Sequence, residues 1–412
     1  MNYAVEPCEA VGMNAGRLER IRPAMQAYVD RGVYTGINTL VARRGRVVHA
    51  GEFGLRDKEA GAPMTADTIF RLYSMTKPVV CTAMMTLLEE ARFRLIDPLA
   101  NYIPAFGAVK VLEADGSLVA PVRPIMIRDL MTHMSGLSYH FVEDSKVREH
   151  YTEGKLLHAH HSLEEIIEDL ARFPLAFQPG SRWRYSVGID VVARLIEVIS
   201  GKPLGAFLHE RLFEPLGMTD TGFGVAPEKR NRLAAMYGRP DVLSHTTTMG
   251  GELAAWMSSV NDRLDVSKTY PVDSPDVFVR GGHGLFGTIG DYFRFAQMLA
   301  NGGELDGERI IGRKTLELMH SNHVPASLLP LEVGGLPIPG YGFGLGSRVL
   351  MDAARSSAPG SIGEFGWSGA AKTYYWVDPK EQVVGLFMTQ SMMSFDLPDF
   401  DLRALAYQAI ED

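Results

Sequence analysis

The chain has 412 residues, of which 46% are hydrophobic and 22% are charged. This length and composition exclude a disordered or fibrous protein and allow a large hydrophobic core. The formal net charge of −8 argues against nucleic-acid or anionic-membrane binding, because both require clustered Lys and Arg side chains. We therefore expect a small-molecule partner.

The cysteine content and the N-terminal segment indicate the subcellular location of the protein. Cys8 and Cys81 are the only cysteines, so the chain has neither a disulfide framework nor a CxxC motif. The first residues lack the basic stretch and apolar run of a secretory signal, and no apolar stretch is long enough to span a bilayer. These features predict a cytoplasmic protein.

The first predicted elements are a helix and a hairpin. Within residues 14–31, Leu18, Ile21, Met25 and Val29 recur at helical spacing, which predicts an amphipathic opening helix. The apolar runs 37–42 and 47–50 follow, joined by Arg-Arg-Gly-Arg, and they predict an antiparallel hairpin.

The middle of the chain, residues 100–275, carries mostly helical signals. Ser162 and Glu165 form a capping box before one helix, and Gly188 opens a second. Strands are predicted around 341–349, 372–377 and 383–389, and a last helix carries Leu402, Leu405 and Ile410.

Strands at both ends of the chain around a helical middle predict an α/β (α+β) fold. We expect one antiparallel sheet flanked by helices and built from both termini, residues 1–100 and 276–412. A mainly helical domain, 101–275, is inserted between them, and the active-site cleft lies between the two domains.

Ser74 and Lys77 stand three residues apart in Ser-Met-Thr-Lys, after an apolar strand-like run and at the start of a predicted helix. This spacing places the lysine amine within reach of the serine hydroxyl. A serine becomes a nucleophile when a neighbour takes its proton, and burial or nearby charge can lower the lysine pKa enough for this role. The motif alone is weak evidence for a nucleophile. In the alternative interpretation, Ser74 caps the helix and Lys77 is a solvated lysine.

The Ser-x-x-Lys element resembles the nucleophile motif of the serine β-lactamase-like and penicillin-binding-protein family. The esterase branch of that family contains the family VIII carboxylesterases, which are class C β-lactamase-like. The resemblance implies that Tyr185, in Arg-Tyr-Ser-Val, matches the tyrosine of the second motif and relays a proton. The alternative for Tyr185 is an ordinary half-buried tyrosine.

The third family motif, Lys-Thr-Gly or His-Thr-Gly, corresponds to Trp367-Ser-Gly369, followed by Ala370. Tryptophan replaces the cation that would hold the carboxylate of a β-lactam or peptide, so it favours an uncharged ester. By resemblance, the backbone amides of Ser74 and Ala370 form the oxyanion hole. Val187 stands where lactamases commonly have asparagine, and this departure also favours an esterase.

Three further signals have alternative interpretations. The segment around Ser368 nearly matches G-x-S-x-G, the nucleophile elbow of α/β-hydrolases, but its flanks predict strand to strand rather than strand to helix. Tyr139 and His283 could line the cleft or pack in the core. A local group of histidines lacks a recognised metal-ligand spacing and is interpreted as solvated: His150, His158, His160 and His161.

These observations predict a serine hydrolase that cleaves small carboxylic esters through an acyl-enzyme on Ser74, with Lys77 and Tyr185 handling the proton. Trp367, Gly369 and Tyr139 are the predicted substrate-binding residues, and neither a cofactor nor a metal is expected. An acyltransferase would use the same acyl-enzyme. A β-lactamase or D,D-peptidase is the next alternative, and a non-catalytic binding module is the last.

Overall fold

The computed structural model describes residues 3–142, 147–239, 241–244, 261–333, 335–392 and 398–412. An antiparallel sheet of eight strands has the order β13-β14-β15-β16-β17-β1-β2-β3. Its strands come from both ends of the chain, as predicted. They are β1 (Gly36–Arg43), β2 (Arg46–Asp57), β3 (Ala62–Pro63), β13 (Tyr341–Phe343), β14 (Arg348–Leu350), β15 (Phe365–Gly369), β16 (Thr373–Asp378) and β17 (Val383–Met388).

Two strands far apart in the sequence join the halves of this sheet. β1 pairs with β2 in the predicted hairpin and, on its other side, with β17, where Leu40 lies opposite Leu386. Because the side-chain period of a strand is two, this register sends alternate residues to opposite faces. Leu40 and Leu386 enter the larger hydrophobic cluster, whereas Val41 and Phe387 enter the smaller one.

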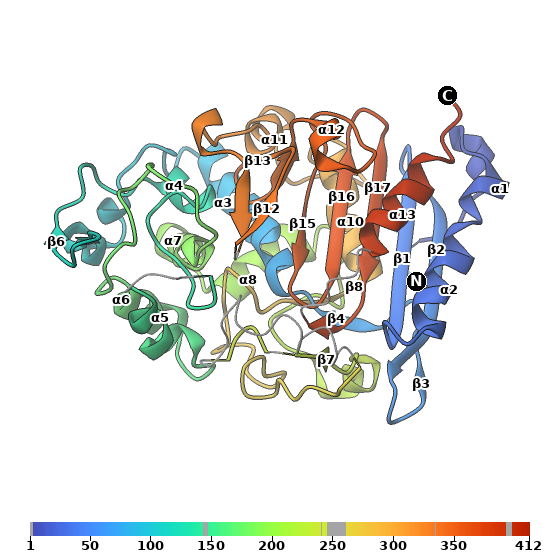
Figure 1. The fold of residues 1–412 in the computed structure, drawn as a ribbon, viewed down its shortest axis with the longest axis horizontal. Helices are drawn as coiled ribbons and strands as arrows, with labels where there is room; N and C mark the ends of the chain where they lie inside the picture. Colours follow the sequence, from blue (N-terminus) through green and yellow to red (C-terminus); the bar gives the residue numbers. More distant parts are fainter. Residues whose placement is uncertain (1–2, 143–146, 240, 245–260, 334, 393–397) are drawn as a thin grey trace.

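Helices cover both faces of the sheet (Figure 1). α2 (Ile21–Asp30) and α13 (Pro398–Tyr407) enclose the smaller cluster, in which Met25 and Leu402 meet Trp376 of β16. α10 (Ile289–Ala300) packs against β16 and β17 on the opposite face. The burial of large apolar side chains on both faces holds the three layers together.

The opening helix differs from the prediction because it is broken into α1 (Ala15–Leu18) and α2. Asn14 caps α1 by accepting the Arg17 N–H. Pro23, which has no N–H to donate, lies in the first turn of α2, where no intrahelical acceptor is available anyway. In a single helix over 14–31, Pro23 would lie in the interior, where it disrupts hydrogen bonding. In the structure it lies instead in the first turn of a second helix.

The C-terminal strands also differ in detail. The strand expected over 341–349 is two strands, β13 and β14, with Gly346 at φ +98° between them. Lys372, interpreted as a strand residue, lies in the preceding turn at φ +60°, so β16 begins at Thr373. The last helix ends at Tyr407, before Ile410.

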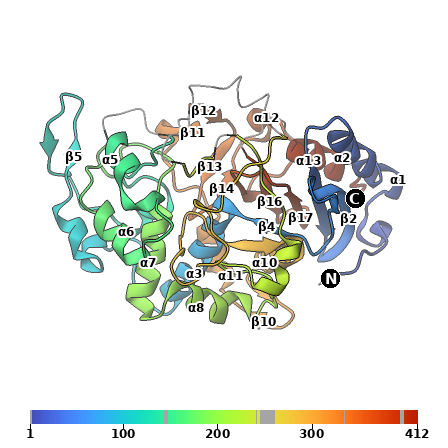
Figure 2. The same cartoon turned by 90° about the horizontal axis from the view of Figure 1, so that it is seen from below.

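The helical middle packs on the sheet part of the chain through α7 (Gly188–Ser200), which contacts α3 (Thr76–Glu89). Figures 1 and 2 both place α3 between α7 and the sheet. α3 is consequently buried on nearly every side, unlike an amphipathic surface helix. The predicted capping box of Ser162 and Glu165 begins α6 (Leu163–Leu170).

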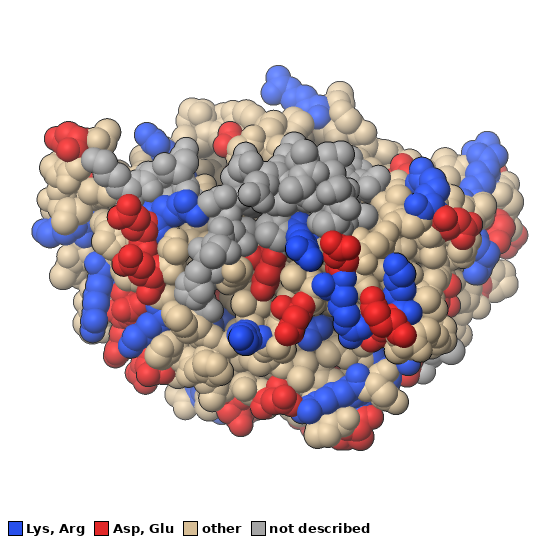
Figure 3. Space-filling model, turned by 60° about the horizontal axis from the view of Figure 1, so that its bottom comes forward, with Lys and Arg blue, Asp and Glu red and all other residues tan. Residues whose placement is uncertain are grey.

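The surface carries both signs of charge. On the face in Figure 3, described basic and acidic side chains lie beside each other. Arg263, for example, pairs with Asp57 and Glu59 at 3.0 and 2.7 Å. Across the described part of the chain, the helices are too short or too polar for a membrane crossing.

Candidate active site

Ser74 is positioned by a sharp turn between a short strand and a buried helix. β4 (Ile69–Arg71) pairs with β8 (Phe286–Thr288), and the chain then passes through a single 3-10 turn, Tyr73–Met75, into α3. Tyr73 adopts φ +47°, an uncommon conformation for a residue with a side chain. This turn places Ser74 at the border of a pocket.

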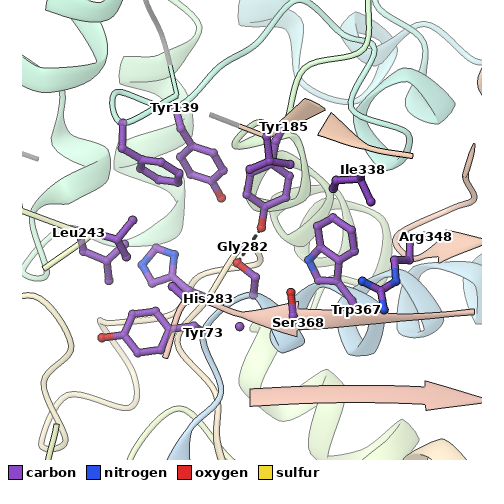
Figure 4. Close-up of a pocket in the computed structure, with 16 residues that line it drawn as sticks. Tyr73, Tyr139, Tyr185, Leu243, Gly282, His283, Ile338, Arg348, Trp367 and Ser368 are labelled. Atoms are coloured by element: carbon purple, nitrogen blue, oxygen red, sulfur yellow. Dashed lines mark hydrogen bonds between the residues drawn. The ribbon is translucent and has the colours of Figure 1, made fainter. Parts of the chain in front are cut away.

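Two proton-bearing groups reach the Ser74 hydroxyl. The Tyr185 hydroxyl lies 2.6 Å from Ser74 Oγ, and Lys77 Nζ lies 3.3 Å from the same atom. Lys77 Nζ also donates to the Gly282 carbonyl at 2.6 Å. In Figure 4 the Tyr185 hydroxyl points toward the centre of the pocket, where the dashed line marks its hydrogen bond. The structure thus brings together the serine, lysine and tyrosine that the sequence singled out.

Lys77 is 1% exposed, so the alternative of a solvated lysine is wrong. Its Nζ lies 4.7 Å from the ring centre of Tyr185 and 5.3 Å from that of Tyr139. Aromatic faces attract a cation, and the attraction is stronger where water is excluded. The two rings and the Gly282 carbonyl therefore fix the amine beside the serine.

His133 supports Tyr185 and was not predicted as a site residue. Its Nδ1 lies 3.1 Å from Ser186 Oγ, and its carbonyl accepts the Arg184 N–H at 2.9 Å, so it holds both neighbours of Tyr185. Burial and, to a lesser extent, the Lys77 charge keep the His133 pKa well below its usual range. The ring is therefore neutral at neutral pH. The one sequence signal for His133 is its place in the segment His-Met-Ser-Gly-Leu, residues 133–137, over which the family resemblance also extends.

β15 forms a second wall of the pocket. Trp367, Gly369 and Ala370 border the pocket that Ser74 and Tyr185 also border. Trp367 is 5% exposed, and its ring packs against Tyr185 at a centroid distance of 5.6 Å. The position of the family cation is thus occupied by a buried aromatic side chain.

Ser368 lies on β15 and is followed by a turn and then by β16. A nucleophile elbow requires a strand that leads into a helix. The nucleophile-elbow interpretation of Ser368 is therefore wrong, although its side chain borders the pocket.

The pocket has a volume of about 230 Å³ and is mostly apolar. Tyr139 and Phe141 stack at 4.8 Å on one side, and Trp367 and Ile338 lie on the other (Figure 4). Among the described residues, the lining contains no Asp or Glu side chain. Its other members are Tyr73, Val242, Leu243, Gly282, His283, Val333, Arg348 and Ser368.

The histidine group does not form a metal site. His150 stacks on Phe173, and His161 approaches Glu165 at 3.6 Å. Among the residues whose placement is described, no three His, Cys, Asp or Glu side chains come together in a way that could hold a metal ion.

His283, which the sequence left as either a cleft or a core residue, borders the pocket. Burial keeps its pKa far below the usual range, so its ring is neutral.

A sheet assembled from both chain ends, beside a buried helix with a Ser-x-x-Lys motif at its start, is the architecture of β-lactamase-like proteins. Residues 21–408 match the Beta-lactamase family, and the chain belongs to that family. The predicted fold class and family resemblance are confirmed.

Known proteins of this family resemble the chain over most of its length. An uncharacterized protein of Mycobacterium tuberculosis is 34% identical and covers 94% of this chain and 92% of its own. Esterase EstB of Burkholderia gladioli is 32% identical over 83% of this chain and 82% of its own. The solved structure of EstCE1, described as a hydrolase with promiscuous acyltransferase activity, has a TM-score of 0.79 and 27% identity, covering 95% and 98%.

Proposed function

We propose that this protein is an esterase-type serine hydrolase that forms an acyl-enzyme on Ser74. The observation that carries the proposal is the pair of contacts to Ser74 Oγ, from the Tyr185 hydroxyl at 2.6 Å and Lys77 Nζ at 3.3 Å. A serine held by two such groups can lose its proton as it attacks a carbonyl carbon.

In the first step, Ser74 Oγ bonds to the ester carbonyl carbon while Lys77, aided by Tyr185, takes the hydroxyl proton. The negative charge on the carbonyl oxygen is stabilised by the Ser74 and Ala370 amides. The carbon–oxygen bond to the alcohol then breaks, and the alcohol leaves with that proton. In the second step, water attacks the acyl-enzyme, a carboxylic acid is released and Ser74 regains its proton.

Trp367 and Val187 support an uncharged ester as the substrate. Trp367 places an indole where a Lys or His would bind a substrate carboxylate, and the pocket lining is mostly apolar. Val187 has no amide to bind the side-chain amide of a β-lactam. EstB, a relative named as an esterase, agrees with this choice.

Acyl transfer is a second candidate activity. An alcohol that enters in place of water would take the acyl group from the same intermediate. EstCE1, which is described as having promiscuous acyltransferase activity, favours this candidate. A β-lactamase, a D,D-peptidase and a non-catalytic module are weaker candidates, because Trp367 disfavours the first two and the Ser74 contacts disfavour the third.

We also propose that the chain forms two domains and that the protein is located in the cytoplasm. We place the site between a sheet domain, 1–100 and 276–412, and a mainly helical domain, 101–275. Cys8 and Cys81 are free and buried, which supports a reducing compartment such as the cytoplasm.

Hydrolysis of p-nitrophenyl acetate and butyrate tests the proposed reaction. We expect wild type to turn over and to show an acyl adduct by intact-mass measurement. Ser74→Ala should lose the adduct and lower kcat/KM by about 10⁴-fold or more, since it removes the nucleophile.

Ser368→Ala is the matched control, because it removes a second serine hydroxyl from the same pocket. It should keep the adduct and most of the activity. Full activity in Ser74→Ala would rule out the proposed nucleophile. Rapid turnover of a chromogenic cephalosporin without ester hydrolysis would favour the β-lactamase instead.

A further inference from the structure

A buried carboxylate that the proposed mechanism does not use lies behind the pocket wall. Asp190 belongs to the first turn of α7, and its exposed fraction is 0%. The same segment carries Tyr185 just before the helix. A buried charge is costly unless it is hydrogen-bonded or paired, so the groups around Asp190 indicate what it does.

One Asp190 oxygen connects to Lys77 through a single residue. Asp190 Oδ1 accepts the Gly282 N–H at 3.0 Å, and the Gly282 carbonyl accepts from Lys77 Nζ at 2.6 Å. Gly282 is thus held at both ends, by a carboxylate on α7 and by an amine on α3. The position of the carbonyl that orients Lys77 depends on the bond to Asp190.

The close packing of this segment leaves the carbonyl little freedom. A Cβ on Gly282 would lie 2.4 Å from the Tyr139 hydroxyl and 2.5 Å from Asp190 Oδ2. A Cβ on Gly281 would lie 2.0 Å from the Ile189 carbonyl. Only glycine allows the loop to approach the start of α7 so closely.

The other Asp190 oxygen, Oδ2, lies beside the Tyr139 hydroxyl, which interacts with the Asp190 carboxylate. A neutral amide at position 190 could still accept the Gly282 N–H. It would carry no charge, however, and Lys77 and Arg280 both act on the Asp190 carboxyl through their charges. The charge of Asp190 therefore affects groups that its hydrogen bond to Gly282 does not reach.

The charged groups facing Asp190 are Lys77 and Arg280, and both lower its pKa, although burial is the larger effect and raises it. Burial and the Asp190 charge raise the pKa of Tyr139 well above its usual value, so this phenol stays neutral. His133 and His283, which also face Lys77, are neutral because burial depresses their pKa. Asp190 in its ionised form is thus the negative group that faces Lys77 among the described residues of this cluster.

We propose that Asp190 is a positioning residue of the active site, which fixes the Gly282 carbonyl beneath Lys77 and sets the charge balance of the Lys77–Tyr185 pair. This inference rests on the proposed function. Removal of a negative charge lowers the pKa of neighbouring groups. Without the charge of Asp190, the group that takes the Ser74 proton should therefore be deprotonated at lower pH, whether it is the amine or the phenol.

The test is the pH dependence of kcat/KM for p-nitrophenyl butyrate in wild type, Asp190→Asn and Asp190→Glu. The acid limb of the Asp190→Asn profile should move to lower pH by roughly half a unit or more, and the plateau should fall. Asp190→Glu retains the charge, so its limb should stay near the wild-type position even where the plateau falls.

Asp291→Asn is the matched control. Asp291 is also a buried carboxylate in the first turn of a helix, α10, where it accepts from the Asp220 N–H and Thr221 Oγ1. This variant should leave the acid limb unchanged. A loss of rate in Asp190→Asn without a shift of the limb would mean a structural role only and would overturn the proposal.

Tyr139→Phe is a second variant in case Asp190→Asn does not fold. It removes the hydroxyl near Asp190 Oδ2 and keeps the ring. The carboxylate should then bind a proton more readily and carry less negative charge, so the acid limb should move to lower pH, in the same direction as in Asp190→Asn. An unmoved limb would overturn the proposal by this second route. Inactivity of wild type towards all esters would instead contradict the proposed function.

Discussion

At the scale of single residues, the Ser74 hydroxyl depends on contacts from two directions. Lys77 approaches from the first turn of α3, which follows directly on the 3-10 turn that holds Ser74, because residues three apart share a face. Tyr185 approaches from a segment 111 residues away in the sequence, held between the neighbours that His133 binds. The lysine contact is local, whereas the tyrosine contact exists only when the chain is folded.

Replacement of Tyr185 by phenylalanine removes the hydroxyl 2.6 Å from Ser74 Oγ and leaves the ring against Trp367. We expect kcat for p-nitrophenyl butyrate to fall by about 10²–10⁴-fold, the range of a lost proton-transfer group, with little change in KM. Steady-state kinetics would measure both parameters.

Tyr28→Phe is the control for Tyr185→Phe, because Tyr28 also donates one hydrogen bond, to Asp401, but lies on the far side of the sheet. It should keep the wild-type kcat. Equal activity of Tyr185→Phe and wild type would exclude a role for this phenol in proton transfer.

At the scale of elements, the pocket depends on the distance between β15 and the turn Tyr73–Met75, which carries Ser74. Thr373 Oγ1 donates to the Leu72 carbonyl at 3.1 Å, which ties β16 to that turn. Gly369 at the end of β15 lies against the same carbonyl: a Cβ there would be 2.4 Å from the Leu72 oxygen and 2.3 Å from Thr373 Oγ1. A larger residue must therefore push the strand away from Ser74.

Gly369→Ala should lower kcat for p-nitrophenyl butyrate by about tenfold or more, because a displacement of about 1 Å at a reacting geometry can cost as much as 10²-fold. Overpacking should also destabilise the fold by about 1–3 kcal/mol, measurable by urea unfolding. Gly222→Ala is the control, since a Cβ at Gly222 would meet nothing within 4 Å. If both variants behave like wild type, close packing at Gly369 does not position the site.

At the scale of the whole molecule, burial of histidines makes the stability depend on pH. His49 is buried with a pKa lowered to about 4, His320 with one lowered to about 3, and those of His133 and His283 are well below the usual range, each mainly through burial. Below pH 6.5 the unfolded chain binds protons at these positions and the folded chain does not. The free energy of unfolding therefore falls as the pH drops below 6.5.

Glu364 has the opposite effect on the free energy of unfolding over part of the same pH range. Burial raises its pKa to about 7, against the opposing charges of Arg403 and Arg348. The folded state therefore holds a proton that the unfolded state loses, and this group destabilises the protein as the pH rises from about 4.5 to about 7.

Asp190, Asp241 and Asp291, whose pKa values burial also raises, act in the same direction as Glu364. Asp57 and Asp220, whose pKa values are lowered, act in the same direction as the histidines. We expect the four buried histidines to decide the balance and to leave a net loss of stability on acidification.

We expect Tm, followed by circular dichroism, to be lower at pH 5 than at pH 7.5 by about 5 °C or more. His49 alone should contribute about 2 kcal/mol of this loss at pH 5, since each pKa unit corresponds to about 1.36 kcal/mol. His49→Gln should reduce the difference in Tm. A Tm that is constant or rises on acidification would contradict this account of the buried histidines.

The sequence by itself determined the features that depend on neighbouring residues. The spacing of Ser74 and Lys77 follows from helix geometry, the capping box of Ser162 and Glu165 from the orphan amides of a helix start, and the hairpin of β1 and β2 from alternation and a turn. Together with the family resemblance, these patterns led to the fold class and an esterase-type enzyme class, in agreement with the family match and with EstB.

Only the tertiary structure decided the features that join distant segments. Gly282 meets Lys77 across 205 residues and Asp190 across 92, and no local pattern marks either contact. The break between α1 and α2, the split of β13 from β14 and the strained φ of Tyr73 were likewise not predicted. The contacts of Gly282 exist only once distant elements have packed, because such contacts can override weak local preferences. The break between α1 and α2 instead follows a local signal, Pro23, which the helical periodicity did not reveal.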